Sequence, residues 1–152
     1  MDNINQNRRK YQAAGLEYEK HYFDEQTGGY VLIHEGHNRG DDFNLGAFVS
    51  EVFAKQGQVV ELVDEHGQEK YVRRFDALVD GEKWEFKVLT NKAKNVRGAF
   101  QNGLVKGRSQ APRIAYHINR QVHVSDLNVG LERTMYIDKE TRKNFRNRLS
   151  LR

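Results

Sequence analysis

Phe75-Asp-Ala-Leu-Val-Asp-Gly-Glu-Lys-Trp-Glu-Phe-Lys-Val88 is the stretch that decides the fold prediction for this chain. Its centre is Asp80-Gly81, a dipeptide typical of two-residue β-hairpin turns when it lies between alternating apolar runs. Counting outward from that turn places Asp76 opposite Glu85. The stretch therefore predicts a hairpin on which two carboxylates face each other.

The predicted hairpin has one charged face and one apolar face, because side chains alternate along a strand. Asp76, Glu85 and Lys87 share the charged face. The apolar face, expected to enter the core, holds Phe75, Ala77, Val79, Trp84, Phe86 and Val88. Like charges opposed across two strands destabilise a sheet unless a cation lies between them. A divalent metal ion would meet this need.

Length and composition indicate one compact domain. The chain has 152 residues, of which 38% are hydrophobic, and no cysteine, which excludes disulfides and cysteine-based zinc sites. We expect a single domain over residues 1–152, with an N-terminal extension (1–43), a core (44–118) and a basic C-terminal part (119–152). A mean hydropathy of −0.85 and the absence of long apolar runs predict a soluble chain without a membrane partner.

The charges are segregated along the chain. Residues 87–125 contain no acid and eight lysines and arginines, whereas 17 of the 21 acids lie at or before Glu85. A cationic segment that follows a carboxylate pair suits a polyanion such as nucleic acid. The alternative is a solvated basic surface without a ligand.

Other segments predict an α/β domain with a mixed central sheet in which helices flank the hairpin. Strands are expected at 30–34, 58–63, 70–79, 82–89 and 114–118, and helices at about 43–56 and 93–106. Residues 1–28 are expected to be weakly ordered or helical, 122–131 are ambiguous, 134–137 predict an edge strand and 139–149 a basic helix. The first of the two helices begins after Asp41 or Asp42 and has an apolar stripe formed by Leu45, Phe48, Val49, Val52 and Phe53.

The charged face of the hairpin has the groups that phosphodiester cleavage requires. Asp76, Glu85 and the backbone carbonyl of Phe86 are hard oxygen ligands suited to Mg²⁺ or Mn²⁺. Lys87 supplies a cation for the attacking hydroxide or the developing charge. Glu51 is expected to join them if its helix turns its charged edge toward the site.

The spacing of Asp76 and Glu85-x-Lys87, after a helix carrying Glu51, resembles the restriction-endonuclease-like superfamily and its PD-(D/E)xK motif. The segment 102–118 resembles bacterial nuclease toxins, the C-terminal domains of contact-dependent growth inhibition and other polymorphic or phage-borne toxins, many of which cleave tRNA. This resemblance implies a metal-dependent nuclease core with Asp76, Glu85 and Lys87 catalytic. Phe75 replaces the proline of the motif, which leaves the chemistry intact because only the acid takes part in it.

The resemblance also implies that Lys106 and Gln110 lie near the substrate phosphate. Asn102 shares a helix edge with Lys106, and Arg97 and Arg108 belong to the acid-free segment, so these three are further candidates for binding substrate.

The expected partners are nucleic acid, with tRNA favoured over DNA, and an immunity protein. The expected place of action is the cytoplasm, after delivery within a larger secreted or phage-borne polypeptide. Three alternatives stay open: a DNA endonuclease of the same fold, a non-catalytic nucleic-acid-binding module, and metal-free RNA cleavage by His34 and His37.

Overall fold

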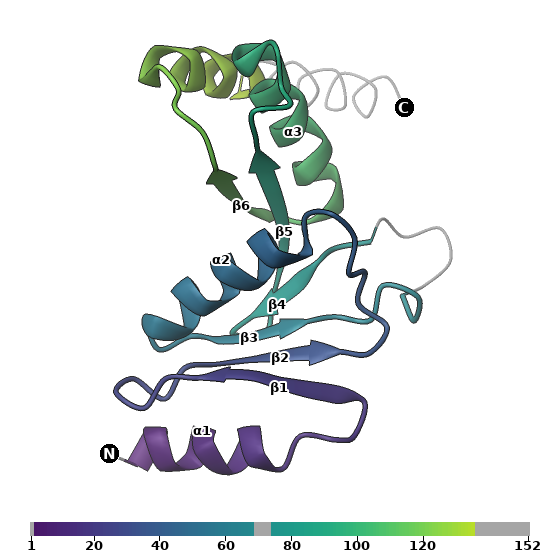
Figure 1. Ribbon diagram of the computed structural model, residues 1–152, viewed down its shortest axis with the longest axis vertical. Helices are drawn as coiled ribbons and strands as arrows, with labels where there is room; N and C mark the ends of the chain where they lie inside the picture. The colour runs from purple at the N-terminus through teal and green to yellow at the C-terminus, as the bar shows by residue number, and fades with distance from the viewer. Residues whose placement is uncertain (1, 69–73, 136–152) are drawn as a thin grey trace, which may run out of the picture. The chain divides into compact units, whose positions relative to one another are not determined.

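A computed structural model describes residues 2–68 and 74–135, which form a six-stranded mixed sheet with helices (Figure 1). The element order is α1 (Asp2–Gln12), β1 (Tyr18–Phe23), β2 (Tyr30–His34), α2 (Phe43–Lys55), β3 (Val59–Leu62), β4 (Ala77–Val79), β5 (Glu82–Leu89), α3 (Val96–Gln110) and β6 (Arg113–Ile118). Residues 124–135 form a further helix. The predicted α/β class with a mixed sheet is confirmed.

The chain divides into two compact units. The first contains Met1–Val88 and Gly107–His117, and the second contains Leu89–Lys106 and Ile118–Arg152. All of the site described below lies in the first unit.

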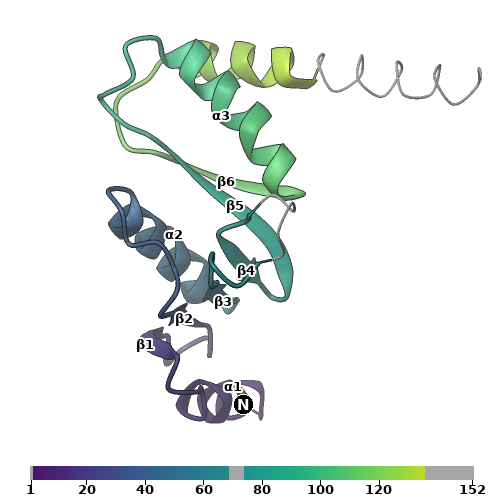
Figure 2. The same cartoon turned by 90° about the vertical axis from the view of Figure 1, so that its right-hand side faces the viewer.

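The strands lie in the sheet in the order β1-β2-β3-β4-β5-β6, which is also their order along the chain. β2 pairs in parallel with β3, whereas the β1–β2, β3–β4 and β4–β5 pairs are antiparallel. The parallel pair needs a crossover connection, and α2 provides it. Helix α1 lies against β1 and β2, as Figure 2 shows.

The hairpin between β4 and β5 has the predicted turn and register. Asp80 and Gly81 have φ angles of 49° and 82°, the left-handed values that a type I′ turn requires. The ladder pairs Val79 with Glu82, Leu78 with Lys83 and Ala77 with Trp84.

The predicted ladder pair of Asp76 with Glu85 is wrong. The ladder ends at Ala77, so Asp76 lies one residue before β4 and its backbone N–H donates to the carbonyl of Trp84 at 3.2 Å. The first hairpin arm is therefore much shorter than expected over 74–79, and residues 70–73 lie outside the described residues.

The core lies between the sheet and α2. Its fully buried side chains come from β2, β3 and β4 and from one alanine of α2: Val31, Ile33, Val60, Leu62, Ala77, Val79 and Ala54. Trp84 and Phe86 of β5 pack against this cluster. The predicted apolar face of the hairpin is thus confirmed at both arms.

The predicted apolar stripe of α2 is confirmed only in part: Phe53 packs against the core and Leu45 and Val49 are half-buried, but the most buried positions are others. Its buried residues are Ala47, Ser50 and Ala54, while Phe48 and Val52 are 50% and 40% exposed. The end of α2 approaches the start of β2 closely, because a Cβ at Gly29 would lie 1.9 Å from the carbonyl oxygen of Ala54. This approach requires glycine at position 29.

Residues 1–43, predicted to be an extension, contribute α1 and two strands of the sheet. Asn7 of α1 is buried and donates through its amide to the carbonyl of Gly28 at 3.0 Å. Strand β1 was not predicted, because Tyr18–Phe23 has little alternation and owes its structure to pairing with β2.

The C-terminal expectations also need correction. Helix α3 ends at Gln110 instead of about 106, which places Gln110 on the helix. Thr134 is helical and its hydroxyl donates to the carbonyl of Gly130, so the edge strand predicted from residue 134 is wrong there. The rest of that strand and the helix predicted at 139–149 lie outside the described residues.

Candidate active site

Asp76 is held in place by the backbone segment that precedes it. The N–H of Phe75 donates to Oε1 of Gln68 at 3.1 Å, and Nε2 of Gln68 donates back to the carbonyl of Phe75 at 2.9 Å. Proline has no N–H to donate. This contact with Gln68 therefore requires a residue other than the proline that the motif named in the sequence analysis has at this position.

The Asp76 carboxylate is attached to β5. Its Oδ2 accepts a hydrogen bond from the backbone N–H of Phe86 at 2.8 Å. Burial raises the pKa of Asp76, and the Phe86 hydrogen bond opposes that rise. Glu65 raises the pKa further by charge repulsion, whereas Lys87 and His37 lower it.

Glu85 is the most buried acid of the site. Its side chain is 3% exposed, and Oε1 accepts a hydrogen bond from Nζ of Lys87 at 2.7 Å. Its second oxygen, Oε2, is buried without a hydrogen-bond partner within residues 2–68 and 74–135. Burial raises the pKa of Glu85 to about 7, with Lys87 lowering it and the nearby Asp76 carboxylate raising it.

Lys87 has a second partner at the end of α3. Its Nζ donates to Oε1 of Gln110 at 3.1 Å, and Nε2 of Gln110 donates to the carbonyl of Arg74 at 3.2 Å. A Cβ at Gly107 would lie 2.9 Å from Cδ1 of Ile114, so the last turn of α3 approaches this region closely because residue 107 is glycine.

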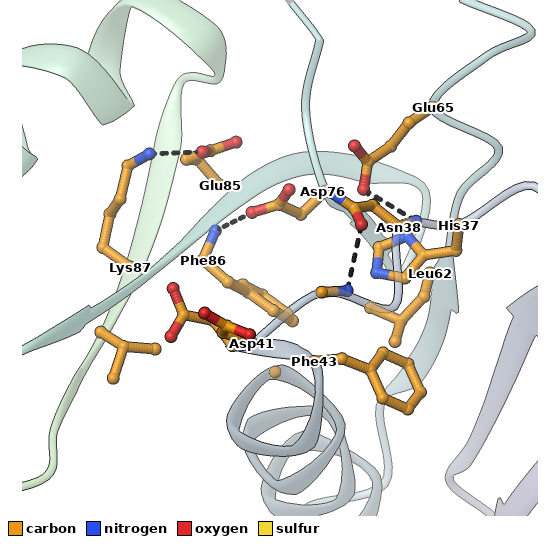
Figure 3. A pocket seen from close by; sticks show the side chains of 14 residues that line it. His37, Asn38, Asp41, Phe43, Leu62, Glu65, Asp76, Glu85, Phe86 and Lys87 are labelled. Atoms are coloured by element: carbon orange, nitrogen blue, oxygen red, sulfur yellow. Dashed lines mark hydrogen bonds and ion pairs between the residues drawn. The ribbon is translucent and has the colours of Figure 1, made fainter.

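The two acids and Lys87 line a pocket of about 330 Å³ (Figure 3). Asp76, Glu85, Phe86 and Lys87 form one wall. The other wall comes from the loop before α2 and the segment after β3, and it includes His37, Asn38, Asp41, Asp42 and Glu65. In Figure 3 Asp76 lies between Glu85 and Lys87 on one side and Glu65 and His37 on the other.

The second wall is fixed by its own hydrogen bonds. Nδ1 of His37 lies 3.0 Å from the carbonyl of Val63 and 3.5 Å from Oε1 of Glu65, and the N–H of Asn38 donates to the same oxygen at 3.2 Å. A carbonyl can only accept, so Nδ1 of His37 carries the proton. Glu65 and Asp41 were not predicted as site residues, because no spacing in the sequence relates these loops to the hairpin.

The two histidines proposed for metal-free chemistry do not meet in this pocket. His37 lines it, whereas His34 does not. Nδ1 of His34 accepts from the N–H of Gly36 at 3.0 Å, and its ring contacts Tyr18 edge-on.

Glu51 is not placed with Asp76 and Glu85. Its Oε1 lies 2.9 Å from Nε2 of His21 on β1, and Glu51 does not line the pocket. The condition for its predicted metal role, a charged edge of α2 turned toward the hairpin, is not met.

The predicted substrate-binding residues fall in two places. Gln110 contacts Lys87, and Arg108 lies on the same end of α3 in the first unit. The other three lie in the second unit, so their relation to the pocket stays a prediction: Asn102, Lys106 and Arg97. Arg97 forms an ion pair with Asp126 at 2.9 Å.

The donors of the pocket fit a hard divalent cation in part. Two carboxylates with raised pKa values lie together, and one buried oxygen of Glu85 has no hydrogen-bond partner in the segments 2–68 and 74–135. The part of the chain that is described contains no group of three or more His, Cys, Asp or Glu side chains placed to hold a metal. Mg²⁺ commonly uses one or two carboxylates and takes its other ligands from water and phosphate, which matches this donor set.

No helix within the described ranges is both long and apolar enough to span a membrane.

The α/β fold thus places a buried acid, Glu85, and a half-buried acid, Asp76, beside a lysine, and these are side-chain types that phosphodiester chemistry can use. Residues 73–146, just under half of the chain, match the family described as the contact-dependent growth inhibition CdiA C-terminal domain. The match includes Asp76, Glu85 and Lys87, and it supports the resemblance to toxins of contact-dependent growth inhibition. No curated protein and no solved structure matches the chain.

Proposed function

We propose that this chain is a toxin domain of the contact-dependent growth inhibition type and a metal-dependent nuclease that hydrolyses phosphodiester bonds. The observation that carries this proposal is the buried carboxylate of Glu85: one oxygen accepts from Lys87, and the other has no hydrogen-bond partner among the described residues. A structural ion pair would be expected to satisfy both oxygens of a buried acid. An open, repelled carboxylate instead suits a site that takes up a cation and a substrate.

Asp76, Glu85 and the carbonyl of Phe86 are the proposed ligands of Mg²⁺ or Mn²⁺. When bound, such an ion lowers the pKa of water and offsets charge on the phosphate in the transition state. A bound cation would also offset the burial of the two carboxylates, which is the main cause of the raised pKa of each, and the charge of Asp76 that raises the pKa of Glu85 further. This proposal includes neither Glu51 nor a third acid from the opposite wall.

Lys87 is the proposed cation of the reaction. Its ammonium has three N–H donors, of which one is given to Glu85 and one to Gln110. The third donor is left for the attacking water or a non-bridging phosphate oxygen. Because the Lys87 side chain is 23% exposed, substrate can reach this donor from the pocket.

RNA, and tRNA in particular, is the favoured substrate, and DNA is the alternative. The preference for tRNA rests only on the resemblance of the sequence to toxin nucleases. The acid-free segment 87–125 supplies the positive charge that either polyanion requires.

The toxin assignment brings two further proposals. A toxin that acts on tRNA requires a specific immunity protein in the producing cell, and the charged pocket is a natural surface for such a partner to cover. The domain would act in the cytoplasm of a target cell after delivery as part of a larger secreted protein, which the CdiA C-terminal match supports.

The test is to incubate the purified domain with total tRNA and with plasmid DNA, each in Mg²⁺, in Mn²⁺ and in EDTA. We expect cleavage of tRNA with metal and none in EDTA. Glu85→Gln and Lys87→Met should each lower the rate at least 100-fold, on the order of the loss of one electrostatic stabiliser. Glu82→Gln and Lys83→Met, exposed changes on the same strand, are the matched controls.

The outcomes separate the alternatives. Cleavage of plasmid alone would replace tRNA with DNA as the substrate, and binding without cleavage in either metal would indicate a non-catalytic module. Full activity in EDTA that is lost in His37→Gln would favour imidazole chemistry. Full activity of both Glu85→Gln and Lys87→Met would refute this site.

A further inference from the structure

Gln110 uses both ends of its amide inside the protein. Its Oε1 accepts from Nζ of Lys87 at 3.1 Å, and its Nε2 donates to the carbonyl of Arg74 at 3.2 Å. These are the two functional atoms of the side chain. One N–H of Nε2 is left for a phosphate, the role that the sequence resemblance implied, but the other contacts of the amide are made within the protein.

We propose that Gln110 is a positioning residue, which sets the direction of the Lys87 ammonium and fixes the backbone that leads to Asp76. The proposal deepens the proposed nuclease function and rests on it for the consequence on catalysis. The hydrogen bonds of Gln110 can be tested even if the protein shows no nuclease activity.

Lys87 needs a second partner to have a defined orientation. A lysine side chain has four rotatable carbon–carbon bonds, and its ammonium turns freely about the last of its bonds. The 2.7 Å bond to Glu85 fixes one N–H, which still permits rotation about that contact. A second bond, to Gln110, fixes the direction of the remaining N–H that the nuclease proposal assigns to water or phosphate.

The segment before Asp76 needs support because it lies outside the β4–β5 ladder. Two glutamines supply that support from different parts of the chain. Gln68 bonds the N–H and the carbonyl of Phe75, and Gln110 bonds the carbonyl of Arg74. Gln110 therefore joins the backbone entering Asp76 to the cation of the site through a single side chain.

The position of Gln110 depends on the last turn of α3. At Gly107 a Cβ would lie 2.9 Å from Cδ1 of Ile114 and 3.5 Å from Cε of Lys87. The missing side chain lets this turn approach the stem of Lys87, which brings the Gln110 amide within hydrogen-bond distance of the ammonium.

The experiment compares wild type with Gln110→Met, which has a similar length and neither polar end, and with Gln56→Met as an exposed control. Circular dichroism and the melting temperature establish that each variant is folded. The first readout is the rate at which Lys87 is acetylated by dilute acetic anhydride, followed by peptide mass spectrometry, with exposed Lys83 as the internal reference.

We expect Gln110→Met to raise the relative labelling rate of Lys87 about ten-fold, the factor for one lost hydrogen bond to a charged group. The second readout is tRNA cleavage in Mg²⁺. There kcat should fall about ten-fold or more, while KM changes little, because a misdirected ammonium affects the transition state more than binding. Gln56→Met should match wild type in both measurements.

Unchanged Lys87 labelling in Gln110→Met would overturn the positioning role. So would a raised KM with an unchanged kcat, because that pattern belongs to a residue that binds substrate. Raised labelling in a protein whose wild type cleaves neither tRNA nor DNA would uphold the positioning of Lys87 and refute the nuclease function. The two proposals can thus fail separately.

Discussion

The carboxylate of Asp76 accepts a hydrogen bond from the backbone N–H of Phe86 at 2.8 Å, which attaches an acid outside β4 to the centre of β5. The same strand carries Glu85 and Lys87 on either side of Phe86. The distance between the two acids is therefore set by a side chain binding to the backbone, and not by a ladder pair. Small changes in the segment before Asp76 should affect the site directly.

Placing a proline at position 75, as in the motif that the sequence resembles, should lower the stability of this protein. Phe75→Pro removes the N–H that donates to Gln68 and should cost about 1–3 kcal/mol of unfolding free energy, the price of a lost hydrogen bond in a partly buried place. Urea unfolding measures the loss. Phe75→Leu retains the N–H and controls for loss of the ring. Equal urea midpoints for the proline and leucine variants would contradict the role assigned to Gln68.

The stability of the metal-free protein should depend on pH through Glu85. The pKa of this group is about 7 in the folded protein, against 4.5 normally, with burial as the main cause. Between these values the folded state binds more protons than the unfolded state, so stability falls as pH rises. The fall could reach about 3 kcal/mol between pH 4.5 and 7.

Urea unfolding in EDTA at several pH values measures this dependence. Glu85→Gln carries no titrating group at this position, and its stability should vary less over the same range. If wild type and Glu85→Gln show the same pH dependence, the rise in the pKa of Glu85 is not what controls stability there.

Divalent metal should stabilise the folded protein at neutral pH and above. Mg²⁺ or Mn²⁺ bound by Asp76 and Glu85 raises the melting temperature in proportion to the logarithm of its concentration once binding saturates. The double variant Asp76→Asn, Glu85→Gln should lose this response, and Glu82→Gln should retain it. Differential scanning fluorimetry with a metal titration is the measurement, and an equal rise in all three proteins would exclude this metal site.

Glu51→Gln should leave cleavage and its metal requirement within about two-fold of wild type, because Glu51 contacts His21 and does not line the pocket. Its cost in stability should be below about 1 kcal/mol, since both partners of the pair are partly exposed. The decisive measurement is the Mg²⁺ concentration that gives half-maximal cleavage. A ten-fold rise would return Glu51 to the metal site.

The hairpin was the most predictable part of the molecule. Its turn depends on two adjacent residues with left-handed φ angles, and its register follows from counting along the chain. Trp84 and Phe86 could be assigned to the core for the same local reason, because alternation decides which face is apolar. Strands β2, β3 and β6 were also predictable from short runs of apolar residues.

The buried face of helix α2 could not be predicted from the sequence in the same way. Its hydrophobic periodicity favoured Phe48 and Val52 as buried residues, yet both are exposed, whereas Phe53 of the same stripe packs against the core. No local pattern records how closely two backbones approach, as Ala54 and Gly29 do. Nor could the sequence show that Glu51 contacts His21 and lies outside the pocket.

The sequence by itself determined that Glu85 and Lys87 share a face and that Asp76 lies near them, because strand alternation and a two-residue turn act over a few residues. Only the tertiary structure decided what surrounds them: the loop residues Glu65 and His37 across the pocket, and Gln110 at the end of α3. These partners come from segments far apart in the chain. These side chains come together only because whole helices and strands pack against one another. The spacing of residues in the sequence does not show how those elements pack.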